Sequence, residues 1–271
     1  MSPLDQAPAE TFRAVRFVLT DMDETLTYRG RLAASTYQAL ERLQAAGLVV
    51  IPVTAASAGW CDQMARMWPI DGVIGENGGL FMQRAPDGHG VVRRYGLAEA
   101  ERARARSRLS RVEREVQQRA PWAAHADDQP FRLTSLAYRQ PEDPARAAEL
   151  EAILRQAGVQ VTRNNLWILA WVGAYDKLAM ARRVLSETYA LDIAKDGDRV
   201  LYCGDSVNDA PMFGFFRHTV GVSTVREHLA HTPVPPRWIT HGPGGAGFVE
   251  AVDAVLAARG ALGDEGRRRG A

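Results

Sequence analysis

Between residues 15 and 79 the chain alternates between short apolar runs and segments with helical periodicity, and this alternation constrains the fold more than any other feature. The runs Val15–Thr20 and Leu48–Val53 are short and continuously apolar, which is typical of strands buried on both faces. Helical spacing follows each run, over Ala33–Ala46 and Ser57–Trp68, and a third short run stands at Val73–Ile74. This order predicts a doubly wound α/β fold, in which helices cover both faces of a mostly parallel, Rossmann-like sheet.

A polar block interrupts the alternation between about residue 80 and residue 172. It contains predicted helices over Ala98–Arg119 and Pro144–Ala157 and strand candidates at Phe131–Arg139, Val159–Arg163 and Leu166–Val172. The alternation then resumes with helix Tyr175–Tyr189, strand Arg199–Cys203, helix Asn208–Phe213, strand Thr219–Val222 and a last helix near Phe248–Ala258. We therefore expect a core domain in two pieces (residues 14–82 and 172–258), an inserted α+β cap domain (83–171) and a flexible tail (259–271).

The composition excludes several classes of function. The 271 residues include 33 basic and 32 acidic side chains, for a net charge of +1, which argues against a dedicated nucleic-acid-binding protein. No apolar run approaches the roughly 18–20 residues that span a bilayer, so we expect no membrane association. The two cysteines cannot form a disulfide framework, and Cys203 lies in an apolar run, which favours a reducing cytoplasm. We expect a monomer or a small homo-oligomer.

Polar side chains stand where the predicted core strands end. Asp21 and Asp23 follow the first strand, Thr54 follows the second, and the segment Gly204–Asp209 follows the strand that contains Cys203. A lysine, Lys177, lies in the helix that returns the chain to the core. Because ligands of open α/β sheets bind beyond the carboxyl ends of the strands, we expect these groups to meet at one edge of the sheet.

Asp21 and Asp23 are two residues apart, so on an extended backbone their carboxyl groups point to the same side. Two carboxylates that face one point repel, and the pKa of one of them rises, which suits a nucleophile paired with a general acid. The alternative is a polar turn that ends a buried strand, with Asp acting as a cap.

Asp205 and Asp209 straddle a predicted strand-to-helix turn. Oxygen ligands from Asp21 and Asp205 suit a hard cation such as Mg²⁺, which binds one or two carboxylates together with phosphate oxygens. Helix capping by Asp is the alternative. Thr54 and Lys177 are weak signals alone, but a lysine and a metal together would offset the charge of a phosphate group placed among carboxylates.

With these segments in order, the chain resembles the haloacid dehalogenase-like superfamily of phosphohydrolases. The resemblance rests on four motifs: Asp21-Met22-Asp23-Glu24-Thr25-Leu26-Thr27, Thr54, Lys177 and Gly204-Asp205-Ser206-Val207-Asn208-Asp209. The long insertion between the second and third motifs is similar to the subclass that acts on sugar phosphates, including sucrose-phosphate phosphatase-like enzymes. The segments Ile74-Gly75-Glu76-Asn77-Gly78-Gly79 and Trp171-Val172-Gly173-Ala174-Tyr175-Asp176-Lys177 also look like that subclass.

The resemblance implies a role for each matching residue. Asp21 would attack phosphorus and form an aspartyl-phosphate, and Asp23 would protonate the leaving alcohol and then activate water. Thr54 and Lys177 would bind the phosphoryl oxygens. Mg²⁺ would lie between the Asp21 carboxylate, the Asp23 backbone carbonyl and Asp205. In addition, Asp209 would support the metal shell and Asn208 would orient groups near the phosphate.

The sequence departs from the family pattern at three places. Glu24 stands where the family usually has Gly, the segment Thr54-Ala55-Ala56-Ser57 lacks the common Gly-Arg after Thr, and Val207 stands where Gly or Pro is frequent. None of these changes removes a catalytic group. The second one weakens any inference about the leaving group.

Together these features predict a Mg²⁺-dependent phosphatase that hydrolyses a small phosphorylated metabolite, with a sugar phosphate as the expected substrate. A phosphomutase on the same scaffold and a catalytically silent binding protein are the alternatives. In the cap, Asn164, Asn165 and Arg163 are candidates for substrate contacts, although Asn-Asn also suits an ordinary hairpin turn. Trp167 and Trp171 share a face of their predicted strand, which favours packing over sugar stacking.

Overall fold

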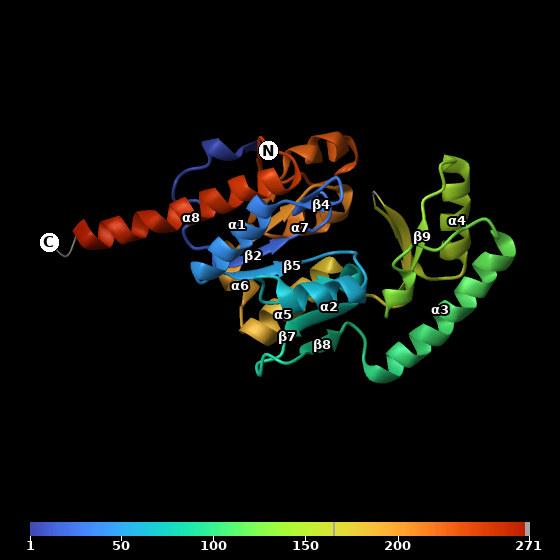
Figure 1. Ribbon diagram of the computed structural model, residues 1–271. Helices are drawn as coiled ribbons and strands as arrows, with labels where there is room; N and C mark the ends of the chain where they lie inside the picture. The colour runs from blue at the N-terminus through green and yellow to red at the C-terminus, as the bar shows by residue number, and fades with distance from the viewer. Residues whose placement is uncertain (165, 269–271) are drawn as a thin grey trace.

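A six-stranded parallel sheet forms the centre of the computed structural model, which describes residues 1–164 and 166–268, with side chains up to residue 260 (Figure 1). Adjacent strands pair in parallel throughout. Their order is β1 (Ser2–Pro3), β14 (Trp238–Ile239), β13 (His218–Gly221), β12 (Val200–Gly204), β2 (Phe17–Thr20) and β5 (Val49–Pro52). The predicted doubly wound fold is confirmed.

Both faces of this sheet are buried, as the continuous apolar strands predict. In β2, Val18 packs into one hydrophobic cluster while Phe17 and Leu19 pack into another, because successive side chains of a strand point to opposite faces. The first cluster includes side chains of α1 (Ala34–Ala45), α2 (Ala58–Met67) and α8 (Gly244–Arg268). The second includes side chains of α5 (Lys177–Tyr189) and α7 (Ala210–Phe215), and the short α6 (Ile193–Asp196) follows α5.

Several element bounds differ from the prediction. The strand predicted from Val15 begins at Phe17, and the helix predicted from Asn208 begins as a 3-10 turn, Val207–Asp209, before α7. The last helix, α8, extends to Arg268 instead of ending near Ala258. Residues 269–271 of the predicted tail lie outside the described residues. Further 3-10 turns are Leu4–Gln6, Glu76–Gly78, Gln129–Phe131, Gly197–Arg199 and Ser223–His231.

The predicted third parallel strand belongs mainly to a different sheet. The strand β6 (Val73–Gly75) has a single parallel bridge to Val53 and otherwise pairs with β7 (Leu80–Arg84), which pairs with β8 (Val91–Tyr95), both in antiparallel fashion. The chain reverses between β6 and β7 because Glu76 and Asn77 both adopt positive φ, +48° and +56°. A short hairpin of β3 (Thr27–Tyr28) and β4 (Arg31–Leu32) follows the first carboxylates.

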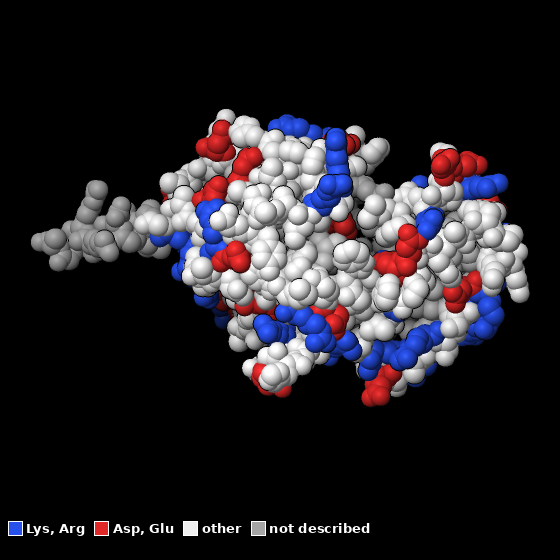
Figure 2. Space-filling view, viewed as in Figure 1, with Lys and Arg blue, Asp and Glu red and all other residues white. Residues whose placement is uncertain are grey.

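The inserted segment folds around its own hydrophobic cluster, to one side of the core (Figure 1). Its antiparallel sheet has the order β10 (Gln160–Arg163), β11 (Trp167–Trp171) and β9 (Ser135–Arg139). The helices α3 (Glu99–Arg119) and α4 (Pro144–Gln156) cover it. Basic side chains gather along α3, with acidic ones among them, on its solvent side (Figure 2).

The strand β7 bears on where the cap begins. The predicted boundary at residue 83 falls inside β7, and Leu80 and Met82 of that strand pack into the core cluster. We propose that the cap spans residues 96 to about 172. At its start, Gly96 approaches the segment by which the chain leaves the cap, so that a Cβ at Gly96 would lie 3.2 Å from the Cβ of Tyr175.

The buried carboxylate of Glu76 fastens the cap to the core. Its oxygens accept hydrogen bonds from the backbone N–H of Leu133 and Thr134, both at 2.8 Å, and from the hydroxyl groups of Thr134 and Ser135 at 2.8 and 2.7 Å. On the core side it accepts a hydrogen bond from the N–H of Ala58 at 3.0 Å. A buried carboxylate needs such partners, and here most of them come from the chain segment that leads into β9.

Within the described residues, no helix combines the length and the apolar character needed to cross a membrane.

The substitution Glu76→Gln tests this attachment. An amide group keeps the shape but turns one acceptor oxygen into a donor that faces N–H and O–H groups. We expect the free energy of unfolding to fall by about 2–4 kcal/mol, since hydrogen bonds to a charged group are the strong ones. Urea unfolding followed by circular dichroism measures it.

Glu115→Gln is the matched control, because Glu115 pairs with Arg119 on the exposed side of α3. Its loss changes the free energy of unfolding by about 0–1 kcal/mol. Equal unfolding midpoints for the two variants would show that the Glu76 interactions contribute little.

Candidate active site

The ends of two neighbouring strands bring the first two carboxylates together. The strands β2 and β12 are paired, with Thr20 opposite Cys203, and the N–H of Asp21 continues the ladder by donating to the carbonyl of Cys203 at 2.9 Å. Asp21 and Asp205 therefore follow adjacent strands at the carboxyl edge of the sheet. This arrangement is the one that the carboxyl-end rule predicts.

Lys177, the first residue of α5, connects these carboxylates to Asp209. Its Nζ lies 2.9 Å from Oδ1 of Asp21 and 3.3 Å from Oδ1 of Asp209, and all three side chains are buried. The side chain of Asp176 accepts a hydrogen bond from the N–H of Ala179 and so caps α5, which fixes the helix end that carries Lys177.

Asp209 is already surrounded by donors. Besides Lys177, its Oδ1 accepts the hydroxyl proton of Tyr202 at 2.5 Å, and its Oδ2 accepts the backbone N–H groups of Asp205 and Ser206 at 3.0 and 3.1 Å. A Cβ at Gly204 would lie 2.7 Å from the Asp209 carboxyl group, so only glycine allows this close approach. Asp209 thus shapes the loop that presents Asp205.

Burial and mutual repulsion make these carboxyl groups hard to ionise. Burial raises the pKa of Asp21 to about 7, against the lowering effect of Lys177 and with a further rise from Asp209 and Asp23. Burial also raises the pKa of Asp23 to about 6, and burial together with Asp209 and Asp21 raises the pKa of Asp205 well above its usual value. If these aspartates are ionised, their negative charge exceeds the single positive charge of the Lys177 ammonium.

A divalent cation fits this excess of charge. One oxygen from each of Asp21, Asp205 and Asp209 lies within 4.8 Å of the others, and the donors are oxygens, which Mg²⁺ prefers. The hydroxyl of Thr25 donates to Oδ1 of Asp205 at 2.9 Å and holds it toward this group. The residues present thus suit Mg²⁺, as the sequence predicts.

Of the other predicted core residues, Asp23 and Asn208 line the hollow beside the carboxylates and Thr54 does not. Asp23 and Asn208 line the same hollow of about 210 Å³ as Asp21, Lys177 and Asp205. Thr54 is buried, its hydroxyl accepts the N–H of Ala56, and among the described residues Ala55 rather than Thr54 lines the hollow. Glu24 keeps a left-handed conformation, φ +57°, which is the one that a glycine at this position would adopt readily.

Of the three cap residues predicted to contact the substrate, Asn164 lines the hollow and Arg163 does not. Asn164 lines the hollow, but its Oδ1 accepts the N–H groups of Leu166 and Trp167, which is a local turn. Arg163 pairs with Glu151 inside the cap. Asn165 lies outside the described residues. The core residue Asn208 accepts a hydrogen bond from the hydroxyl of Thr162, 3.3 Å away, so the cap contacts the core at the site.

Sequence reasoning missed a buried cap arginine beside the site. Arg132 donates to the carbonyl of Ala55 at 3.1 Å and forms two hydrogen bonds with Asp128, at 2.8 and 3.1 Å. Charges on Arg132 and Asp128 both act on the pKa of Asp23, in opposite directions. No local pattern in this Pro- and Asp-rich stretch signals such a contact.

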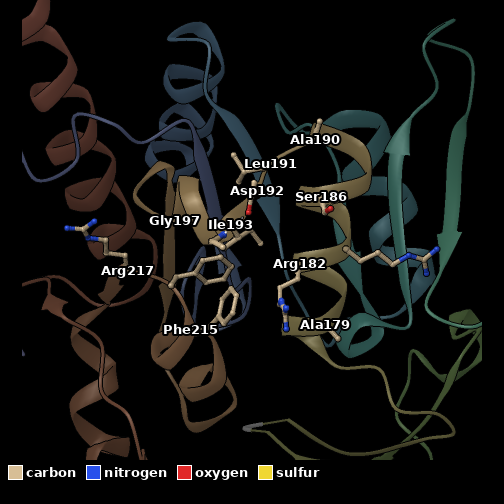
Figure 3. A pocket seen from close by; sticks show the side chains of 13 residues that line it. Ala179, Arg182, Ser186, Ala190, Leu191, Asp192, Ile193, Gly197, Phe215 and Arg217 are labelled. Carbon is tan, nitrogen blue, oxygen red and sulfur yellow. Dashed lines mark hydrogen bonds between the residues drawn. The ribbon is translucent and has the colours of Figure 1, made fainter.

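A larger hollow, of about 980 Å³, lies on another face, between α5, α6 and α7 (Figure 3). Arg182, Arg183, Phe215 and Arg217 line it, and the guanidinium of Arg183 is paired with Glu187. The cluster of carboxylates with Lys177 lies in the smaller hollow, which we therefore take as the candidate active site.

No protein-family model and no curated protein matches the chain. Solved structures do match its fold. The Thermoplasma acidophilum protein 0175 has a TM-score of 0.71 and 18% identity, with 90% of this chain and 99% of that chain covered. Sucrose-phosphatase from Synechocystis, solved with sucrose and phosphate, has a TM-score of 0.62 and 16% identity, with 90% and 98% covered.

A phosphatase of the haloalkanoate (HAD) enzyme superfamily from Bacteroides thetaiotaomicron has a TM-score of 0.60 and 19% identity, with 90% of this chain and 96% of that chain covered. The chain therefore has the fold of these solved phosphatases. The fold that the motif resemblance implies is confirmed.

Mg²⁺ should stabilise the folded protein in a pH-dependent way. Because the pKa of Asp21 is raised to about 7, its ionised form is unfavourable without a cation, and stability falls as the pH rises through that value. A cation binds the ionised form, so its stabilising effect grows with pH. At a Mg²⁺ concentration about 100 times its Kd, we expect the Tm at pH 8 to rise by roughly 5–10 °C, and by less at pH 5.5.

Differential scanning fluorimetry at constant ionic strength measures this shift. Asp205→Asn, which removes one of the clustered carboxylates, should reduce it strongly. A Tm that does not respond to Mg²⁺ at either pH would exclude a cation site here.

Proposed function

We propose that the protein is a Mg²⁺-dependent phosphatase that hydrolyses a small phosphomonoester through an aspartyl-phosphate. The observation that carries this proposal is the convergence of Asp21, Lys177 and Asp205 in one buried site, with Asp23 in the same hollow. Phosphoryl transfer needs positioned charge more than it needs special functional groups, and this site supplies both signs of charge.

In the proposed reaction Asp21 is the nucleophile. A carboxylate oxygen of Asp21 bonds to phosphorus while the ester P–O bond breaks, and Asp23 gives its proton to the leaving alcohol. Water then attacks the phosphorus of the aspartyl-phosphate, the bond between phosphorus and the Asp21 oxygen breaks, and Asp23 takes a proton from that water, so phosphate and the free enzyme result. A carboxyl group whose pKa is raised to about 6 by burial suits both of these proton transfers.

The remaining groups bind charge. Lys177 would hold a phosphoryl oxygen from its position beside Asp21, and Asn208 would orient the phosphate. Thr54, whose hydroxyl accepts the N–H of Ala56, would hold the Ala55 turn that lines the hollow. Asp21, Asp205 and the backbone carbonyl of Asp23 would hold Mg²⁺, which when bound offsets the charge on the phosphoryl oxygens. Since donors already surround both oxygens of Asp209, we assign it to holding Lys177 and the Asp205 loop in place rather than to direct ligation.

A screen for phosphate release over many phosphorylated metabolites, with Mg²⁺ present, tests the proposal. A phosphomutase would convert one ester into its isomer with little free phosphate, and a silent binding protein would release none. The likeness to sucrose-phosphatase supports including sugar phosphates, which the sequence analysis expects, in that screen.

Asp21→Asn should abolish turnover without unfolding the protein. The amide keeps the shape but cannot attack phosphorus, so kcat should fall on the order of 10³-fold or more. Its Tm should equal or exceed that of the wild type, because a buried group that resists ionisation has been neutralised.

Asp253→Asn is the matched control, since Asp253 of α8 is half-exposed and forms an ion pair with Arg42 of α1. It should keep normal kcat. Near-normal turnover by Asp21→Asn would instead exclude Asp21 as the nucleophile.

A further inference from the structure

A second hollow continues from the candidate active site toward the seam between core and cap. Its volume is about 490 Å³, and Asp23, Gly30, Ala55, Asn164 and Leu166 line both hollows. A group attached to a phosphate beside Asp21 would therefore extend past Asp23 into this space.

Large apolar side chains dominate the wall of this second hollow. From the core come Met22, Leu32, Trp60, Met64 and Trp68, and from the cap come Phe131, Leu166 and Trp167. Of the two tryptophans predicted to share a face, Trp167 thus lines a hollow while Trp171 donates its indole N–H to the carbonyl of Tyr175.

Three of these side chains remain in contact with solvent at the mouth. Trp60 is 55% exposed, Phe131 59% and Leu166 47%. They come from α2, from the turn Gln129–Phe131 and from the turn before β11, so folding gathers them from distant parts of the chain. Exposed apolar side chains that gather around a hollow mark a binding surface, because folding alone gains nothing from leaving them in water.

Apart from Asp23, which we propose as the general acid, the aspartate, asparagine and threonine side chains that line the hollow have partners within the protein. Asp128 binds Arg132, Asp127 binds Arg139, and Oδ1 of Asn164 accepts two backbone N–H groups. The hydroxyl of Thr27 accepts the N–H of Glu24 and donates to the carbonyl of Met22. A polyol in this hollow would find few free partners, and each hydroxyl buried without one weakens binding by roughly ten-fold or more.

We propose that the preferred leaving group is an apolar alcohol, aromatic or branched, rather than a sugar. This inference rests on the proposed phosphatase activity, since it concerns the group that Asp23 would protonate.

Three monophosphates of primary alcohols test the inference: 2-(2-naphthyl)ethyl phosphate, glucose 6-phosphate and ethyl phosphate. Their ester bonds have similar intrinsic reactivity, so differences in kcat/KM report on the leaving-group pocket. We expect kcat/KM for the naphthyl ester to exceed that for glucose 6-phosphate at least 100-fold. An equal or higher value for glucose 6-phosphate would overturn the inference and leave the proposed phosphatase activity intact.

The variant Trp60→Ala tests whether the preference for the naphthyl ester arises in this hollow. It should reduce the ratio of kcat/KM between the naphthyl and ethyl esters at least ten-fold, mainly through KM. Met67→Ala is the matched control, because Met67 is an exposed apolar residue at the end of the same helix and does not line the hollow among the described residues. An unchanged ratio in Trp60→Ala would contradict the assignment of this pocket.

If no ester releases phosphate, the proposed phosphatase activity fails. The preference of the pocket for an apolar group is then tested by measuring how tightly the esters bind. Tryptophan fluorescence of the wild-type protein with Mg²⁺ would be titrated with the naphthyl ester and with glucose 6-phosphate. Binding of the naphthyl ester at least ten-fold tighter supports an apolar pocket, and equal or weaker binding overturns it.

Discussion

The contact between the Lys177 ammonium and the Asp21 and Asp209 carboxylates is the interaction on which the site depends. Asp21 precedes the insertion, whereas Lys177 and Asp209 follow it, and all three side chains are buried. A buried charge without a partner is strongly destabilising, and the Lys177 ammonium is the partner that the two carboxylates share. The two pieces of the core must therefore be folded together before the candidate site exists.

The attachment of the cap follows a similar principle. Glu76 binds the segment that leads into β9, and Arg132 of the cap binds the carbonyl of Ala55 in the core. The second contact lies at the candidate site, because Ala55 lines the hollow and the charge of Arg132 acts on the pKa of Asp23. The shape of the apolar pocket is thus set by charged groups that are themselves buried and fully engaged. Polar interactions position the cap, and apolar side chains are left to face a ligand.

Residue order alone predicts Asp21, Asp23, Lys177 and Asp205, because the ends of parallel strands must share one edge. It does not predict the contacts of Glu76 and Arg132 between core and cap, because those partners lie more than fifty residues away and follow no local period. It assigns β6 to the wrong sheet for a related reason. Glu76, Asn77 and Gly78 in succession adopt positive φ and reverse the chain, and the first two are not glycine. For Asn164 the sequence offers both a turn and a substrate contact, and the structure contains the turn.

The near contact between Gly96 and Tyr175 makes the size of the cap independent of the geometry of the core. The chain enters and leaves the cap at nearly one point. The 80 residues from Gly96 to Tyr175 therefore form a closed loop on the core, with its two ends close together. The entropy of closing such a loop grows only slowly with its length. A cap of different size can therefore be attached at this point while the carboxyl edge of the core sheet stays as it is, which leaves the length of the insertion free to diverge.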